Sequence, residues 1–136
     1  SKHRREHVSL VFQDHNLIDY LTPEENLRLV NPKADMKILE DLGLSREESK
    51  RNIMHLSGGQ RQRVAVGRAL VAPGRAILAD EPTGSLDPEM TDEVIDLLRH
   101  AAHQLGKCVI VVTHSKRVAD SADAVYTLRH KKLAKA

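Results

Sequence analysis

Two adjacent carboxylates, Asp80 and Glu81, follow the short apolar run AILA. Successive side chains at the end of a strand point in opposite directions. One carboxylate can therefore hold a hard cation such as Mg²⁺ while its neighbour faces a water molecule to be activated. For this dipeptide alone, an acidic loop after a strand is an equally good interpretation.

A second candidate for chemistry is the stretch LSGGQ at residues 56–60, which opens a predicted helix capped by Ser57. Gly58 and Gly59 are costly in a helix because each loses more backbone freedom than alanine. They leave the amides at the helix start open to an anion, to which Ser57 and Gln60 can add hydrogen bonds. We expect three arginines of the same helix to help hold phosphate nearby, namely Arg61, Arg63 and Arg68. The structural alternative is a flexible helix cap.

Alternating strand and helix patterns must position these residues. Strands are predicted at residues 7–13, 76–80, 107–113 and 124–130, the second and third as apolar runs buried on both faces. Helices are predicted at residues 33–42, 57–71 and 88–105, with shorter ones opening at Thr22, Ser45 and Ser115. The alternation predicts an α/β domain with a mainly parallel sheet.

The polar residues at the strand ends fall together in this arrangement. Ligands of an open parallel sheet bind beyond the carboxyl ends of its strands. Gln13 ends the first predicted strand, Asp80 and Glu81 end the second, and Thr113 and His114 follow the third. We therefore expect these side chains to line one crevice.

Composition sets the outer bounds. The chain has 136 residues, a net charge of +2 and no apolar run long enough to cross a membrane. Cys108 is the only cysteine, so an internal disulfide is excluded. Basic residues gather at 2–5 and 129–136, and we interpret both as solvated, frayed termini. His100 and His103 are interpreted as part of a solvated helix face rather than a metal site.

Taken together, the motifs resemble those of the nucleotide-binding domains of ABC (ATP-binding cassette) transporters. Residues 56–70 resemble the signature motif with its helix, 76–82 the Walker B segment, and 84–87 the D-loop. Residues 11–13 resemble the Q-loop and 111–114 the switch-histidine region, all in the family's order. The sequence EPTGSLD at residues 81–87 and the sequence TLRHKKL at residues 127–133 further resemble the bacterial subfamily of lipoprotein-release, macrolide-export and peptide-resistance transporters.

The resemblance implies a P-loop NTPase-like α/β fold, with a mainly parallel sheet, flanking helices and a small helical subdomain. It assigns residues 1–16 and 56–136 to the catalytic core and residues 17–55 to the helical subdomain.

The resemblance also implies roles for the residues at the strand ends. Asp80 and Gln13 would hold Mg²⁺, and Gln13 would also reach the nucleophile and sense the membrane partner. Glu81 would act as the general base or polarise the attacking water, and His114 would contact the γ-phosphate of ATP. Catalysis would rest on positioning and electrostatics.

A second nucleotide-binding domain is implied by the remaining motifs. Ser57, Gly58, Gly59 and Gln60 would bind ATP held by the opposite subunit of a head-to-tail dimer, and Asp87 would work across the same interface. The opening glycines would then let backbone amides meet a phosphate supplied in trans.

One expected motif does not occur in these 136 residues: the phosphate-cradling loop GxxxxGK[ST], or Walker A. The nearest stretch, AAHQLGKC at 101–108, is predicted to be a helix end with Gly106 as its cap. The family places this loop upstream of the Q-loop. The expectation is therefore the C-terminal portion of a cassette, which alone neither binds ATP tightly nor hydrolyses it.

The resulting functional hypothesis is a partial ATPase subunit that powers movement of a substrate across a membrane. It would lie peripherally at the cytoplasmic face of the cell membrane, with transmembrane permease subunits as partners and no nucleic acid expected. One alternative is a soluble ABC-type ATPase acting on nucleic acid or ribosomes. Another is a non-catalytic interaction module, such as a partial protein that lends its signature helix to a complete partner.

Overall fold

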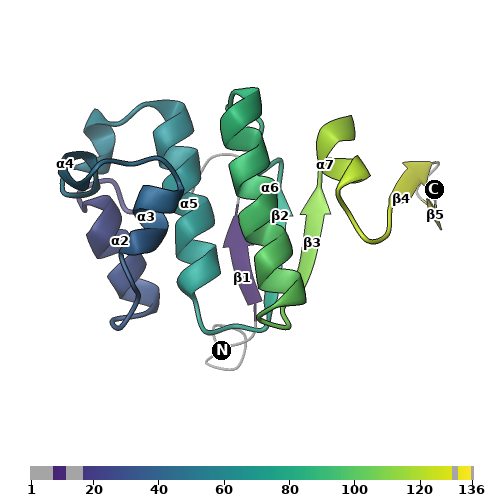
Figure 1. The fold of residues 1–136 in the computed structure, drawn as a ribbon, viewed down its shortest axis with the longest axis horizontal. Helices are drawn as coiled ribbons and strands as arrows, with labels where there is room; N and C mark the ends of the chain where they lie inside the picture. Colours follow the sequence, from purple (N-terminus) through teal and green to yellow (C-terminus); the bar gives the residue numbers. More distant parts are fainter. Residues whose placement is uncertain (1–7, 12–16, 130–131, 136) are drawn as a thin grey trace.

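Three parallel strands form the sheet that carries the candidate site. The computed structural model describes residues 8–11, 17–129 and 132–135. The strands are β1 (Val8–Val11), β2 (Ala76–Asp80) and β3 (Cys108–Val112), in the order β1-β2-β3 (Figure 1). Val8 pairs with Ala76 and Ala76 with Cys108, so the three carboxyl ends lie at one edge. The predicted parallel α/β fold is confirmed.

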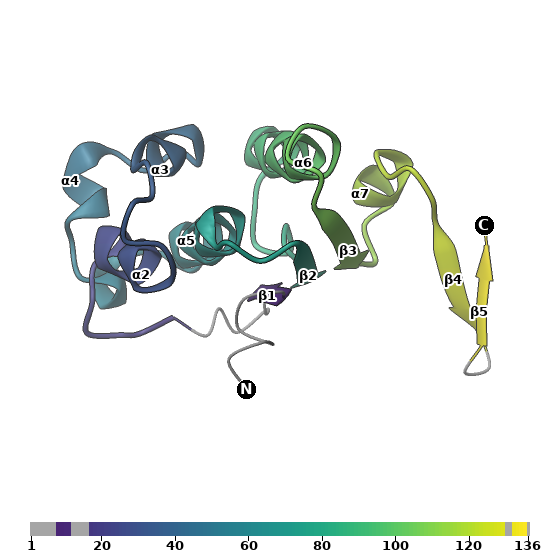
Figure 2. The same cartoon turned by 90° about the horizontal axis from the view of Figure 1, so that it is seen from below.

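Two long helices cover one face of this sheet. Helices α5 (Gly58–Val71) and α6 (Pro88–His103) lie on the same side of the strands as the short helix α7 (Lys116–Asp120) (Figure 2). Their apolar sides and the strands form one buried cluster, which includes Val11, Val64, Val66, Ile77, Val94 and Leu98. The helices at 57–71 and 88–105 were thus predicted closely.

The opposite face of the sheet corrects one prediction. Strands β2 and β3 were expected to be buried on both faces, but Leu78 is 38% exposed and Ile110 and Val112 are 54% and 55% exposed. Among the described residues, helices cover only the other side, so alternate strand residues are left to solvent.

The segment before α5 is helical and packs onto it. It contains α2 (Pro23–Val30), α3 (Lys37–Asp41), α4 (Arg46–Ser49) and the 3₁₀ turn η1 (Ile53–His55). A Cβ at Gly67 of α5 would lie only 2.9 Å from Cδ1 of Leu42, so the helices approach closely there. Leu27, Leu39 and Leu42 are fully buried in the same cluster as the sheet. The subdomain boundaries at 17 and 55 stay a prediction.

Helix starts in this segment follow the sequence closely. Thr22 and Ser45 each close a capping box, with Glu25 and Glu48 as the reciprocal partners. The helix predicted at residues 33–42 is shorter, because α3 begins only at Lys37. The Asp35 side chain accepts a hydrogen bond from the Lys37 amide at 2.9 Å, a local bond that competes with helix formation.

The end of α6 differs slightly from its prediction. The helix stops at His103, and Gly106 takes a φ of +67° just beyond it, which fits the predicted glycine-assisted ending. Leu105 was predicted to be the last residue of this helix, but it lies past the helix end and is 58% exposed. The buried residues of α6 are Thr91, Val94, Ile95, Leu98 and Ala101.

The last two strands form a separate hairpin. β4 (Tyr126–Arg129) pairs antiparallel with β5 (Lys132–Lys135), and the pair extends away from the three-stranded sheet (Figure 2). A strand at residues 124–130 was predicted, but not its pairing outside the parallel sheet. The basic end was expected to be frayed, whereas residues 132–135 are paired, with Leu133 opposite Leu128. None of the described helices is long and apolar enough to cross a membrane.

Candidate active site

Glu81 lies at the centre of the polar cluster beyond the strand ends. Its backbone N–H donates to the carbonyl of Val112 at 2.8 Å, which extends the β2–β3 pairing by one residue. Its carboxylate accepts two further bonds from the chain after β3. The His114 amide donates to Oε1 at 2.7 Å, and the Thr113 hydroxyl donates to Oε2 at 3.1 Å. The predicted meeting of these strand ends is therefore present.

The backbone of Glu81 is unusual. Its φ is +49°, and it is the only non-glycine residue with positive φ in the described part of the chain. Such a conformation costs of order 1 to 3 kcal/mol and persists only where the surroundings hold it. The carbonyl of Glu81 accepts from the Gly84 amide at 3.2 Å and from Nε2 of Gln62 at 2.7 Å.

Asp80 is the last residue of β2 and is exposed. Its backbone pairs with Val112 of β3, but its side chain forms no hydrogen bond or ion pair with the other described residues. Its neighbour Glu81, in contrast, is held by the end of β3. The two carboxylates thus have different surroundings, although Glu81 lies past the end of β2 and does not continue the alternation of the strand.

Thr113 and His114 are held by the start of α7. The Ser115 amide donates to the Thr113 hydroxyl at 2.9 Å, so the proton of that hydroxyl is directed to Glu81. Ser115 caps α7, as predicted. Arg117 of α7 forms a two-pronged ion pair with Asp92 of α6 at 2.6 and 2.7 Å. Hydrogen bonding to Arg117 lowers the pKa of Asp92.

The amino end of α5 lies at the same edge of the sheet (Figure 1). Ser57 is exposed and caps the helix, accepting from the Gln60 amide at 3.1 Å. The Gln60 side chain accepts from the Ser57 amide at 2.9 Å, and its Nε2 donates to Glu48. Both polar atoms of the Gln60 side chain are therefore used within the chain.

The two glycines differ in their surroundings. A Cβ at Gly58 would find no atom within 4 Å, so nothing in the described structure requires glycine there for packing. A Cβ at Gly59 would lie 3.4 Å from the carbonyl oxygen of Ser85, in the segment between β2 and α6. The signature-like residues and the D-loop-like residues 84–87 therefore adjoin each other.

The arginines of α5 are less available than expected. Arg63 donates through Nε to the carbonyl of Gly59 at 3.2 Å and through Nη1 to that of Leu42 at 3.0 Å. Burial lowers the pKa values of Arg63 and Arg68. Nε of Arg61 is buried without a partner among the described residues. Arg63 thus stabilises the start of α5, and the expectation that it helps hold phosphate stays a prediction.

Two other predicted site residues have distinct outcomes. Asp87 caps α6, accepting from the Met90 amide at 2.8 Å, and its side chain is exposed beside the α5 start. Gln13 lies outside the described residues.

One residue of the site, Gln62, was not singled out from the sequence. A polar residue on the apolar side of α5 was the available signal, since Val66 one turn later is fully buried.

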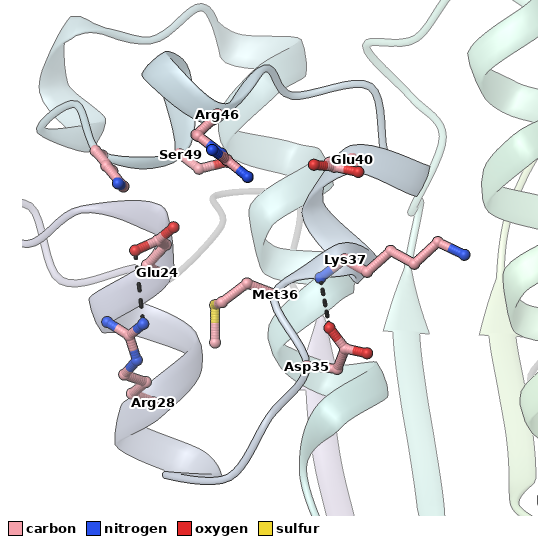
Figure 3. Close-up of a pocket in the computed structure, with 9 residues that line it drawn as sticks. Glu24, Arg28, Asp35, Met36, Lys37, Glu40, Arg46 and Ser49 are labelled. Carbon is pink, nitrogen blue, oxygen red and sulfur yellow. Dashed lines mark hydrogen bonds and ion pairs between the residues drawn. The ribbon is translucent and has the colours of Figure 1, made fainter.

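The hollow drawn in Figure 3 lies elsewhere, between α2, α3 and α4. Acidic and basic residues both line this pocket, and some of them bind one another. Arg28 and Glu24 are 3.6 Å apart, and Asp35 accepts from the Lys37 amide. This pocket therefore brings together none of the residues at the strand ends.

Comparison with known proteins assigns the family. The family model described as "ABC transporter" matches residues 1–84, more than half of the chain. The chain belongs to the ABC transporter family. The strand-end cluster and the glycine-opened helix are thus those of an ABC transporter protein.

Relatives among curated ABC transporter proteins support the finer resemblance. The chain is 36% identical over 130 residues to the uncharacterized ABC transporter ATP-binding protein YclH of Bacillus subtilis. It is 41% identical over 135 residues to the lipoprotein-releasing system ATP-binding protein LolD of Rickettsia prowazekii. It is also 39% identical over 136 residues to the macrolide export ATP-binding/permease protein MacB of Escherichia coli K12.

These matches cover most of this chain but only part of each relative. They take in 88%, 91% and 93% of this chain, and 58%, 60% and 21% of YclH, LolD and MacB respectively. The chain thus spans about three fifths of the length of the first two.

Solved structures confirm the fold. The dimeric post-hydrolysis state of the ATP-binding cassette MJ0796, bound to ADP and Pi, matches with a TM-score of 0.86 at 33% identity. That match covers 98% of this chain and 65% of the other. A second dimeric MJ0796 structure, a bacterial ABC transporter cassette, matches with a TM-score of 0.83 at 36% identity, over 92% of this chain and 60% of the other.

Proposed function

We propose that this chain supplies the signature helix and the water-activating carboxylate of an ABC-type ATPase that powers movement of a substrate across a membrane. The observation that carries this proposal is the placement of Glu81. Its carboxylate lies at the carboxyl edge of the sheet, next to His114, and the open start of α5 lies at the same edge.

Within this site, each residue at the strand ends has its own role. Glu81 activates the attacking water, and His114 contacts the γ-phosphate of ATP. Gln13 of the Q-loop-like segment reaches the metal and the nucleophile. Hydrolysis of this kind depends on groups held in position rather than on covalent chemistry.

The start of α5 serves a nucleotide bound to a second cassette. Ser57, Gly58 and Gly59 present amides to the γ-phosphate, and Gln60 holds Ser57 in its capping conformation. Asp87, exposed beside this start, contacts the partner across the same interface. The dimeric state named for the MJ0796 structures supports pairing of two cassettes, and we propose that the pair is head to tail.

The donor set fits Mg²⁺. In nucleotide sites this ion is held by one or two carboxylates together with substrate phosphates and waters. Asp80 is exposed and unpaired among the described residues, which suits such a role, and no cluster of three or more metal-binding side chains occurs there. Asp80 and Gln13 would hold the ion, which would neutralise charge developing on the phosphates.

The membrane partner is proposed from the relatives. LolD is named for lipoprotein release, and MacB for macrolide export with a permease on the same chain. We infer that this chain likewise works with transmembrane permease domains, lying peripherally at the cytoplasmic face of the membrane.

The experiment compares two proteins. One is the 136-residue chain alone. The other, termed the completed cassette, is a chimera in which the phosphate-loop segment of a relative precedes residue 1. Phosphate release with ATP and Mg²⁺ should be at background for the chain alone and well above it for the completed cassette. Turnover by the chain alone, or none by a folded completed cassette, would refute the proposal.

A further inference from the structure

Gln62 is a fully buried polar residue in the second turn of α5, 0% exposed. Its Nε2 donates to the backbone carbonyl of Glu81 at 2.7 Å, 19 positions along the chain. This bond joins the helix that opens with the signature-like glycines to the residue proposed to activate water. An apolar side chain at position 62 would fill the space but could not donate this bond.

The bond acts on a strained residue. Glu81 has a φ of +49°, which a residue with a Cβ adopts only when neighbours hold it there. The end of β3 holds its amide and its carboxylate, through Val112 and His114. Its carbonyl is held by the Gly84 amide at 3.2 Å, within the same turn, and by Gln62 at 2.7 Å. Among the residues that the structure describes, Gln62 is therefore the only helix residue whose side chain holds Glu81 by a hydrogen bond.

We propose that Gln62 is a positioning residue, which holds Glu81 in its strained conformation and links the position of that carboxylate to the position of α5. Gly58, which opens α5, is one helical turn from Gln62, and helices move as rigid units over such short distances. A shift of α5 on contact with a nucleotide in trans would then be passed to Glu81 of its own subunit. This consequence rests on the proposed function, whereas the positioning of Glu81 does not.

The first test uses the 136-residue chain without nucleotide. Gln62→Met keeps the length of the side chain and removes the donor. The His114 amide reports on Glu81, because it donates to Oε1 at 2.7 Å. In Gln62→Met its proton resonance should move upfield and its hydrogen exchange should quicken roughly tenfold or more, as expected when a bond to a charged group is weakened.

A matched control separates positioning from general loss of packing. Val66→Ala removes buried volume from the same helix one turn later, at a residue that is also 0% exposed. It should lower stability while leaving the His114 proton resonance in place. An unchanged His114 amide in Gln62→Met, or the same shift in Val66→Ala, would overturn the proposal.

A second test relieves the strain directly. Glycine adopts positive φ readily, and it keeps the carbonyl that accepts from Gln62, so Glu81→Gly removes the strain but not the bond. In the chain with Glu81, relaxation of its strained backbone offsets part of the cost of losing that bond. The fold-change in the unfolding equilibrium caused by Gln62→Met should therefore be several-fold larger in the Glu81→Gly background. If Gln62→Met does not fold, Gln62→Asn, whose amide is one methylene shorter, replaces it in both backgrounds. An equal or smaller effect in the Glu81→Gly background would overturn the proposal.

ATP turnover by the completed cassette distinguishes a failure of the Gln62 positioning proposal from a failure of the proposed ATPase function. Gln62→Met should lower kcat about tenfold with KM for ATP little changed, because the variant misplaces Glu81 without touching nucleotide. If the completed cassette never hydrolyses ATP but the His114 amide moves as expected, the function is refuted and the positioning stands. Normal kcat in Gln62→Met, with an unmoved His114 amide, overturns the positioning alone.

Discussion

The backbone amide of His114 lies 2.7 Å from Oε1 of Glu81, although 33 positions separate the two residues in the chain. The contact exists because β2 and β3 are neighbouring parallel strands that end at the same edge. It places a carboxylate, a histidine and the loop before α6 in one small region. This is the arrangement on which the proposed ATPase site depends.

Gly58 should be replaceable without loss of the fold. A Cβ there meets nothing within 4 Å, and alanine favours a helix over glycine. Gly58→Ala and Gly58→Asp should therefore keep or raise the melting temperature of the chain, because an acidic residue near a helix start adds about 0.3 to 1 kcal/mol. Differential scanning calorimetry checks this.

The same Gly58→Asp change should harm function. A carboxylate at the α5 start repels the phosphate proposed to bind there, and such like-charge contacts cost several kcal/mol. ATP turnover by the completed cassette should fall at least about tenfold, with Gly58→Ala affected less. As a control, Gly67→Ala should destabilise the fold, since its Cβ would lie 2.9 Å from Leu42. Full turnover in Gly58→Asp would exclude the phosphate contact.

The two faces of the sheet should respond differently to truncation. Ile77 is fully buried under the helices, so Ile77→Ala should lower the free energy of unfolding by about 2 to 5 kcal/mol. Ile110 lies on the open face, and Ile110→Ala should cost less than about 1 kcal/mol. Urea unfolding of both variants of the 136-residue chain measures the difference. Equal costs would show that the face bearing Ile110 is covered in solution.

Glu48 should make the junction of α4 and α5 sensitive to acid. The pKa of Glu48 lies below its ordinary value of 4.5, chiefly because the Ser45 amide donates a hydrogen bond to its carboxylate. The Ser45 hydroxyl, the Gln60 side chain and the charge of Arg51 lower this pKa further, whereas burial raises it by less. The folded state therefore favours the ionised form. Its contribution is present above the ordinary pKa and is lost as pH falls through the lowered value.

The matched variant for this prediction is Glu48→Gln, which keeps the shape and removes the charge. Because Glu48 is only partly buried, solvent screens its interactions, and the difference in unfolding free energy from wild type should be only about 0.5 kcal/mol near pH 7. Thermal unfolding between pH 7 and about 3 should show that difference shrinking to zero at the acid end. A difference that persists at pH values below the lowered pKa would contradict the charged interaction.

Local signals in the sequence were enough to predict where the helices begin. Thr22, Ser45 and Ser57 each precede a glutamate or glutamine by three positions, and each closes a capping box. These starts depend on residues within one turn, so they can be read without the rest of the fold. The meeting of Glu81 and His114 is not local, but it was predictable from the order of strands and helices, because parallel strands bring their carboxyl ends to one edge.

Features that depend on distant packing were not predictable in this way. The apolar pattern of β3 fits burial on both faces, yet Ile110 and Val112 are exposed among the described residues, because coverage depends on which elements lie above the strand. Gln62 gave no spacing signal, since its partner is a carbonyl in another element. The strained φ of Glu81 likewise results from contacts that only the assembled fold provides.

The most direct measurement of the central claim is sedimentation velocity of the completed cassette carrying Glu81→Gln. With ATP and Mg²⁺ it should form a stable dimer that retains unhydrolysed ATP, whereas the wild-type cassette should return to monomer as ATP is consumed. Addition of Gly58→Asp to the Glu81→Gln cassette should prevent dimer formation. A Glu81→Gln cassette that stays monomeric with ATP, or that consumes ATP at the wild-type rate, would contradict the claim.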